Sequence, residues 1–110
     1  MGIRNTRPFL PLTETQVATL GAHMGVYEFA ADDGEVLYIG YAGGRSQFGL
    51  RGNIETQRHA SDASGFRFEI TTAYMTRYQE LLMVHVADHG RLPRENSETD
   101  VPNLGKLSPG

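Results

Sequence analysis

Two tripeptides, Gly25-Val26-Tyr27 and Tyr38-Ile39-Gly40, hold the residues whose types and spacing most favour a chemical role. Ten residues separate the two tyrosines, and Asp33-Gly34 between them is a signal for a tight hairpin turn. Such a hairpin places the tyrosines on neighbouring strands, where we expect both hydroxyls to line one concave, solvent-open surface. A tyrosine in a strand is common for packing alone. The pair, rather than either residue, therefore indicates a site.

Charged and amide side chains farther along the chain are candidates for contacts with a phosphate or a cation. Arg51 opens a predicted helix, where a cation is unfavourable for the helix dipole, and its planar guanidinium suits phosphate oxygens. Glu80 follows Arg77 by three residues, a spacing that also fits an ordinary ion pair on a helix surface. Asn96 follows the last predicted helix, where asparagine is also common in turns.

The chain has no cysteine, which excludes disulfides, thiolate zinc sites and cysteine nucleophiles. Any metal must therefore bind to oxygen or imidazole ligands. Three of the histidines, His23, His59 and His89, show no recognisable metal-ligand spacing. His85 lies on the apolar face of a predicted helix, where we expect a packed core histidine.

The pattern of apolar residues predicts the elements that position these side chains. The capping-box form of Thr13-Glu14-Thr15-Gln16 begins a helix that runs to about His23. Strands follow at Val26 to Ala30, Val36 to Tyr41 and Phe66 to Thr72, and further helices at Leu50 to His59 and Met75 to His89. We expect an α/β fold with a small three-stranded antiparallel sheet flanked by helices, in the order α-β-β-α-β-α.

With the tripeptides on such a hairpin, the chain resembles the GIY-YIG nuclease family over roughly residues 24 to 96. The resemblance implies an endonuclease that hydrolyses phosphodiester bonds in DNA with Mg²⁺ or Mn²⁺. It implies that Tyr27 accepts a proton from water, that Tyr38 positions water or phosphate, and that Arg51 pairs with phosphate oxygens. Glu80 would be the only protein ligand of the metal, and Asn96 corresponds to an asparagine that often follows the helix of this glutamate.

The chain also departs from the family pattern near the arginine. Arg51 lies thirteen residues beyond Tyr38, farther than is usual in the family, and Arg45 in the preceding glycine loop is an alternative. Glu55 stands one turn after Arg51, where the family commonly has His or Tyr. The role of that His or Tyr would fall to His59, two turns after Arg51, or be absent here. The predicted substrate contacts are Arg45, Arg58, His59 and Asn96. A catalytically weak or inactive module of the same fold, which binds nucleic acid or a protein partner, is the alternative function.

Composition limits what such a site can bind. The 110 residues carry a net charge of −3 and 39% apolar residues, which fits one domain at 1–96 and a polar, flexible tail at 97–110. Five arginines lie between Arg45 and Arg77, so we expect weak, salt-dependent DNA binding through three or four phosphate contacts. Specificity would come from a protein partner or a homo-oligomer. No apolar segment resembles a signal peptide or a membrane span, and we expect a cytoplasmic protein.

Overall fold

A computed structural model describes residues 7–44 and 46–96. Seven elements follow one another along the chain: β1 (Leu10–Pro11), α1 (Glu14–Val17), β2 (Gly25–Ala30), β3 (Val36–Ala42), α2 (Gly49–Arg58), β4 (Gly65–Ile70) and α3 (Tyr74–His89). The predicted tail at 97–110 and Arg45 lie outside the described residues.

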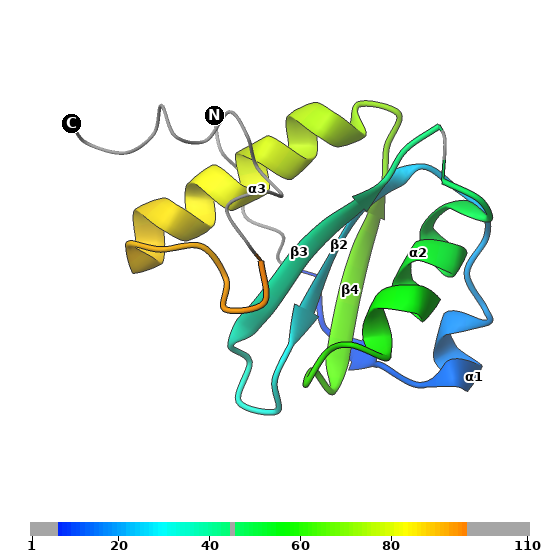
Figure 1. The fold of residues 1–110 in the computed structure, drawn as a ribbon, viewed down its shortest axis with the longest axis horizontal. Coiled ribbons are helices and arrows are strands. Elements are labelled where there is room, and N and C mark those ends of the chain that lie inside the picture. The colour runs from blue at the N-terminus through cyan, green and yellow to red at the C-terminus, as the bar shows by residue number, and fades with distance from the viewer. Residues whose placement is uncertain (1–6, 45, 97–110) are drawn as a thin grey trace.

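The four strands form one antiparallel sheet in the order β1-β4-β2-β3. Helices cover both of its faces: α1 and α2 lie on one face, and the long helix α3 crosses the other (Figure 1). The predicted α/β class is therefore confirmed. The side chains of Tyr27 and Phe29 belong to the α1–α2 side, and those of Val26 and Ile39 to the α3 side, because neighbouring residues of a strand point to opposite faces.

The predicted strand count is wrong, since β1 adds a fourth strand at the sheet edge. Leu10 pairs with Phe66 and Pro11 with Gly65, and the Leu12 N–H donates to the Ser64 carbonyl at 2.9 Å. A two-residue strand shows no alternation, and proline lacks the N–H that a central strand needs. The sequence pattern therefore could not show this strand.

The first helix is also shorter than predicted. Its start is confirmed, because the Thr13 hydroxyl accepts from the Gln16 N–H at 3.2 Å. The helix ends at Val17 rather than near His23. After Val17, the hydrogen bonds join residues three apart: the Thr19 N–H donates to the Gln16 carbonyl at 3.1 Å, and the Leu20 N–H donates to the Val17 carbonyl at 3.0 Å. These bonds are typical of a 3₁₀ turn, and the α-helix ends before them.

The central hairpin agrees with the prediction. In its turn, the Gly34 N–H donates a hydrogen bond to the Ala31 carbonyl. Gly34 has a positive φ of 90°, which favours glycine. In β4, Phe66 and Phe68 pack towards α1 and α2, whereas Arg67 and Glu69 lie on the α3 side, as the alternation predicts. No helix within residues 7–44 and 46–96 is long and apolar enough to cross a membrane.

Candidate functional site

Tyr27 and Tyr38 lie side by side on the face of the sheet that α2 covers. Their ring centroids are 6.0 Å apart with a tilt of 42°, although the two residues are not direct partners in the ladder. Tyr27 pairs with Gly40, and Tyr38 pairs with Phe29. The ring of Tyr27 lies over Gly40 so closely that a Cβ there would be 2.5 Å from its Cζ atom. The glycine of the second tripeptide therefore leaves the space that the tyrosine of the first one fills.

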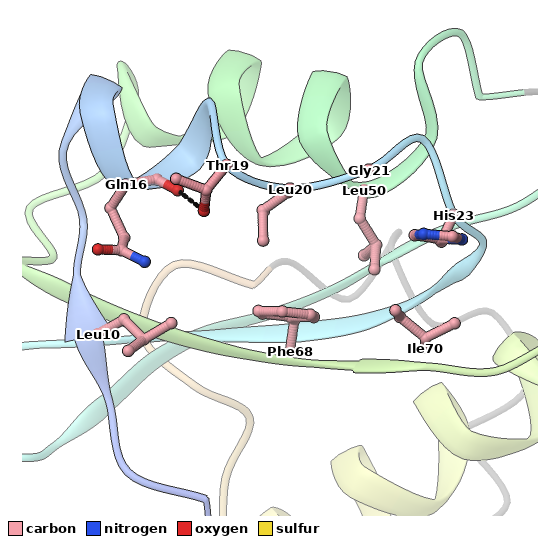
Figure 2. Close-up of a pocket in the computed structure, with 9 residues that line it drawn as sticks. All are labelled: Leu10, Gln16, Thr19, Leu20, Gly21, His23, Leu50, Phe68 and Ile70. Atoms are coloured by element: carbon pink, nitrogen blue, oxygen red, sulfur yellow. Dashed lines mark hydrogen bonds between the residues drawn. The ribbon is translucent and has the colours of Figure 1, made fainter.

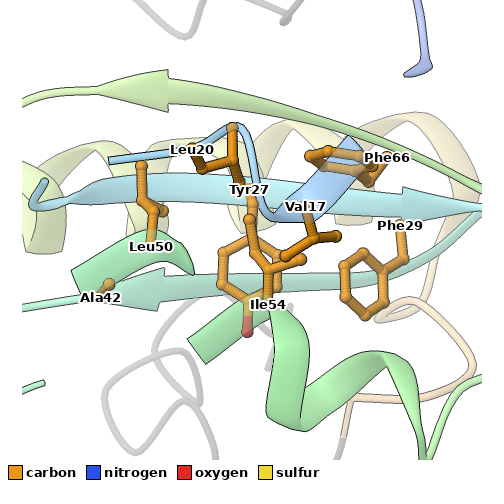
Figure 3. Packing of buried hydrophobic residues seen from close by; sticks show 8 residues of the cluster. All are labelled: Val17, Leu20, Tyr27, Phe29, Ala42, Leu50, Ile54 and Phe66. Atoms are coloured by element: carbon orange, nitrogen blue, oxygen red, sulfur yellow. The ribbon is translucent and has the colours of Figure 1, made fainter. Parts of the chain in front are cut away.

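The Tyr27 side chain is sealed inside the protein. It is fully buried within an apolar cluster that includes Leu50 and Ile54 of α2 (Figure 3). At the tip of the ring, the hydroxyl donates a hydrogen bond to Oδ1 of Asn53. Tyr38 is only partly buried at the rim of the same cluster. We predicted that both hydroxyls line a solvent-open surface, but Tyr27 has none of its surface exposed.

Asn53 is the residue near the tyrosines that sequence reasoning missed. It lies between Leu50 and Ile54 at the helical spacing that faces the sheet, so it is a polar residue on the core side of α2. A polar side chain at such a position needs a hydrogen-bond partner. The position of a polar residue on the core side of α2 was therefore the signal that the sequence offered. In the structure, Tyr27 is the hydrogen-bond partner of Asn53.

Arg51 lies on a different side of α2 from Asn53. Its side chain is exposed, and its guanidinium carbon lies 5.9 Å from the ring centroid of Phe48. With Glu14 and Ala18 of the α1 segment, it borders a shallow hollow between the two helices. The structure thus brings Arg51 to Phe48 rather than to Tyr27.

Glu80 is on α3 and therefore on the opposite side of the sheet from Tyr27. Its carboxylate accepts a hydrogen bond from Arg77, and the same guanidinium binds Glu69 of β4 at 3.0 Å. The structure does not bring Glu80 to either tyrosine. The carboxylate already has a cationic partner in Arg77, so the residues around it do not fit a metal ion that would act beside Tyr27.

The predicted substrate contacts at the end of α2 form a small charged cluster. Arg58 binds both carboxylate oxygens of Glu55, at 2.7 and 3.1 Å, and His59 Nε2 lies 2.9 Å from the same carboxylate. The hydrogen bond from Arg58 lowers the pKa of Glu55 below its ordinary value. Glu55 therefore binds Arg58 and His59, the two residues that we expected to contact substrate.

Asn96 has a structural task at the edge of the sheet. Its side-chain amide accepts from the Ile39 N–H at 2.9 Å and donates to the Ile39 carbonyl at 2.9 Å. It thus completes the hydrogen bonds of β3 much as another strand would. Next to it, the Glu95 N–H donates to the Leu37 carbonyl at 2.8 Å. These contacts close the edge of β3.

Ion pairs neutralise most arginines of the predicted DNA-binding stretch. Arg58 binds Glu55, Arg67 binds Glu28 at 2.5 Å, and Arg77 binds Glu69 and Glu80. Glu28 is almost completely buried, and this burial raises its pKa although Arg67 acts in the opposite sense. Of the arginines described between residues 45 and 77, Arg51 alone has no carboxylate partner in the described part of the chain.

Two further hollows lie beside α2. One, of about 410 Å³, is open and mostly polar; its lining residues are Ser46, Gln47, Phe48, Gly52, Asn53, Thr56 and Gln57. The other, of about 300 Å³, lies between the segment after α1 and strand β4 (Figure 2). There Leu20 and Leu50 face Phe68 and Ile70, and none of the predicted catalytic residues takes part. Asn53 lines the polar hollow and binds the Tyr27 hydroxyl, so this hollow lies next to Tyr27.

Comparison with known proteins gives one match. The model of the family described as Domain of unknown function (DUF7508) matches residues 3–88, so the chain belongs to that family. Neither the curated proteins nor the solved structures give a match.

Proposed function

We propose that the chain is a nucleic-acid-binding module built on a GIY-YIG-type hairpin, without a metal held by Glu80. The observation that carries the proposal is the separation of Tyr27 from Glu80 by the sheet. Tyr27 is buried against Asn53, and the Glu80 carboxylate binds Arg77. A general base must reach the proton that it accepts, directly or through one water. This arrangement therefore favours binding over hydrolysis.

The choice of nucleic acid as ligand rests on the resemblance of the two tripeptides and on the exposed Arg51. Arg51 has no carboxylate partner within residues 7–44 and 46–96, so its guanidinium is available to phosphate oxygens. Because Arg58, Arg67 and Arg77 bind carboxylates, we expect one or two phosphate contacts instead of three or four. Affinity for duplex DNA should then fall only about 3.5- to 12-fold between 50 and 200 mM salt, at a slope of about 0.9 per contact.

A metal-dependent DNA endonuclease is the second candidate function. It is favoured by the two tyrosine rings, which lie 6.0 Å apart on one face as the resemblance requires. For this function a water molecule must reach the Tyr27 hydroxyl, and the divalent ion must bind elsewhere than at the Glu80–Arg77 pair.

Two assays on the purified chain separate these candidates. Fluorescence anisotropy with short labelled single-stranded and duplex oligonucleotides at 50 mM salt measures binding, and nicking of supercoiled plasmid with Mg²⁺ or Mn²⁺ measures cleavage. We expect weak binding that Arg51→Ala reduces, and no cleavage. Cleavage that Tyr27→Phe abolishes would establish the second candidate instead. Absence of binding to every oligonucleotide at millimolar protein would refute the module.

A further inference from the structure

Phe48 is an exposed aromatic residue in a strained backbone conformation. Its side chain is 56% exposed, and it is the one residue other than glycine with positive φ in the described part of the chain, at φ 63° and ψ 14°. A left-handed conformation costs a bulky residue free energy that glycine avoids. An exposed ring gains little from packing, so the fold itself gives no reason for phenylalanine here.

The backbone around Phe48 is held in place by its neighbours. Gly49 also has positive φ, and a Cβ there would lie 2.4 Å from the carbonyl carbon of Ala22. The Leu50 N–H donates to the His23 carbonyl at 2.8 Å. These contacts fix the start of α2 against the segment before β2, and so they hold the ring of Phe48 outward. Strain that the surroundings enforce in this way is typical of functional positions.

The surroundings of the ring combine a cation with unused amide groups. Arg51 lies 5.9 Å from the ring centroid and has no carboxylate partner among the described residues. Phe48 also borders the polar hollow, where the side chains of Gln47 and Gln57 make no hydrogen bond with the described residues. The Nδ2 group of Asn53 likewise makes no hydrogen bond with any described residue, because only the side-chain oxygen of Asn53 binds Tyr27. An amide side chain can both donate to and accept from the edge of a nucleobase.

We propose that Phe48 and Arg51 form a stacking site for an unpaired base of single-stranded nucleic acid. The ring offers a π-face to the base, the amides of the polar hollow meet its edge, and Arg51 binds the adjoining phosphate. A duplex would not fit this site, because its bases are stacked on each other and their faces are not accessible. The inference rests on the proposed function and names its ligand class.

The test uses the full chain and single-stranded oligonucleotides that carry 2-aminopurine, whose fluorescence falls when the base stacks. We expect quenching with the wild type and with Phe48→Tyr, and loss of quenching with Phe48→Gly. Affinity should fall roughly five- to hundredfold in Phe48→Gly, the range found for the loss of one stacked base. Because glycine relieves the positive φ, the melting temperature of this variant should be unchanged or higher. Matched DNA and RNA strands, and the duplex of the same sequence, complete the set.

The outcomes separate this inference from the proposed function. Binding of nucleic acid that Phe48→Gly does not weaken, or equal affinity for duplex and single strand, would overturn the stacking site and leave the binding module standing. Failure of the wild type to bind any nucleic acid would overturn both. A lower melting temperature in Phe48→Gly would show that the ring serves the fold, and would also contradict the inference.

Discussion

Replacement of Gly40 by alanine tests whether the second tripeptide serves to seat the tyrosines. The added Cβ would lie 2.5 Å from Cζ and 2.6 Å from the hydroxyl oxygen of Tyr27, and 2.8 Å from Cε2 of Tyr38. Overpacking of this kind costs about 1–3 kcal/mol, and alanine in a strand recovers about 0.5–1 kcal/mol relative to glycine. Two rings must move, and the Tyr27 hydroxyl must shift from Asn53. We therefore expect Gly40→Ala to lower the free energy of unfolding by about 2 kcal/mol.

Thermal and urea unfolding measure the effect. A loss of about 2 kcal/mol corresponds to a fall of roughly 8–16 °C in melting temperature for a domain of this size. Gly44→Ala is the matched control, because its nearest heavy atom is Sδ of Met24 at 3.9 Å, an ordinary contact. In a double-mutant cycle, Tyr27→Leu should cost less in the Gly40→Ala protein than in the wild type, since the collision is then already relieved. Equal melting temperatures for Gly40→Ala and Gly44→Ala would refute the argument.

Two further predictions concern the sheet. Burial raises the folded-state pKa of Glu28, so its contribution to stability is largest below the ordinary value of 4.5 and is lost as the pH rises through the raised value. The stability of the wild type relative to Glu28→Gln should therefore fall as the pH increases above 4.5, and an increase measured by urea unfolding would contradict this. Asn96→Ala removes two hydrogen bonds to Ile39, so we expect a loss of about 1–2 kcal/mol and faster hydrogen exchange at the Ile39 amide; unchanged exchange would contradict the edge-closing role.

The sequence sufficed to predict the central hairpin and β4 because their signals are local. An Asp-Gly turn between two segments rich in β-forming residues determines that β2 pairs with β3. In β4, apolar and charged residues alternate because one face of the strand is buried and the other forms ion pairs. The strand β1 has only two residues, one of them a proline, and so it carries no pattern. Its pairing with β4 depends on residues more than fifty positions away.

The candidate site was less predictable because it depends on contacts between distant elements. Glu28 and Arg67 are 39 residues apart in the sequence, and their pairing follows only from the register of β2 and β4. A count of arginines therefore overestimates the number of guanidinium groups without a carboxylate partner in the described chain. By contrast, the ion pair between Arg77 and Glu80 follows from their spacing of three residues on a helix. The structure therefore agrees with the interpretation of Glu80 as one half of an ordinary ion pair.

Packing accounts for the glycines of both tripeptides that first indicated chemistry. A Cβ on Gly25 would lie 2.2 Å from the Glu69 carbonyl oxygen and would separate β2 from β4, and a Cβ on Gly40 would displace Tyr27. These two glycines therefore determine how three strands fit together, whatever the chain binds. Function must be sought among residues that packing does not explain. Phe48 is the clearest of these, because it is exposed, strained and adjacent to an arginine without a carboxylate partner in the described chain.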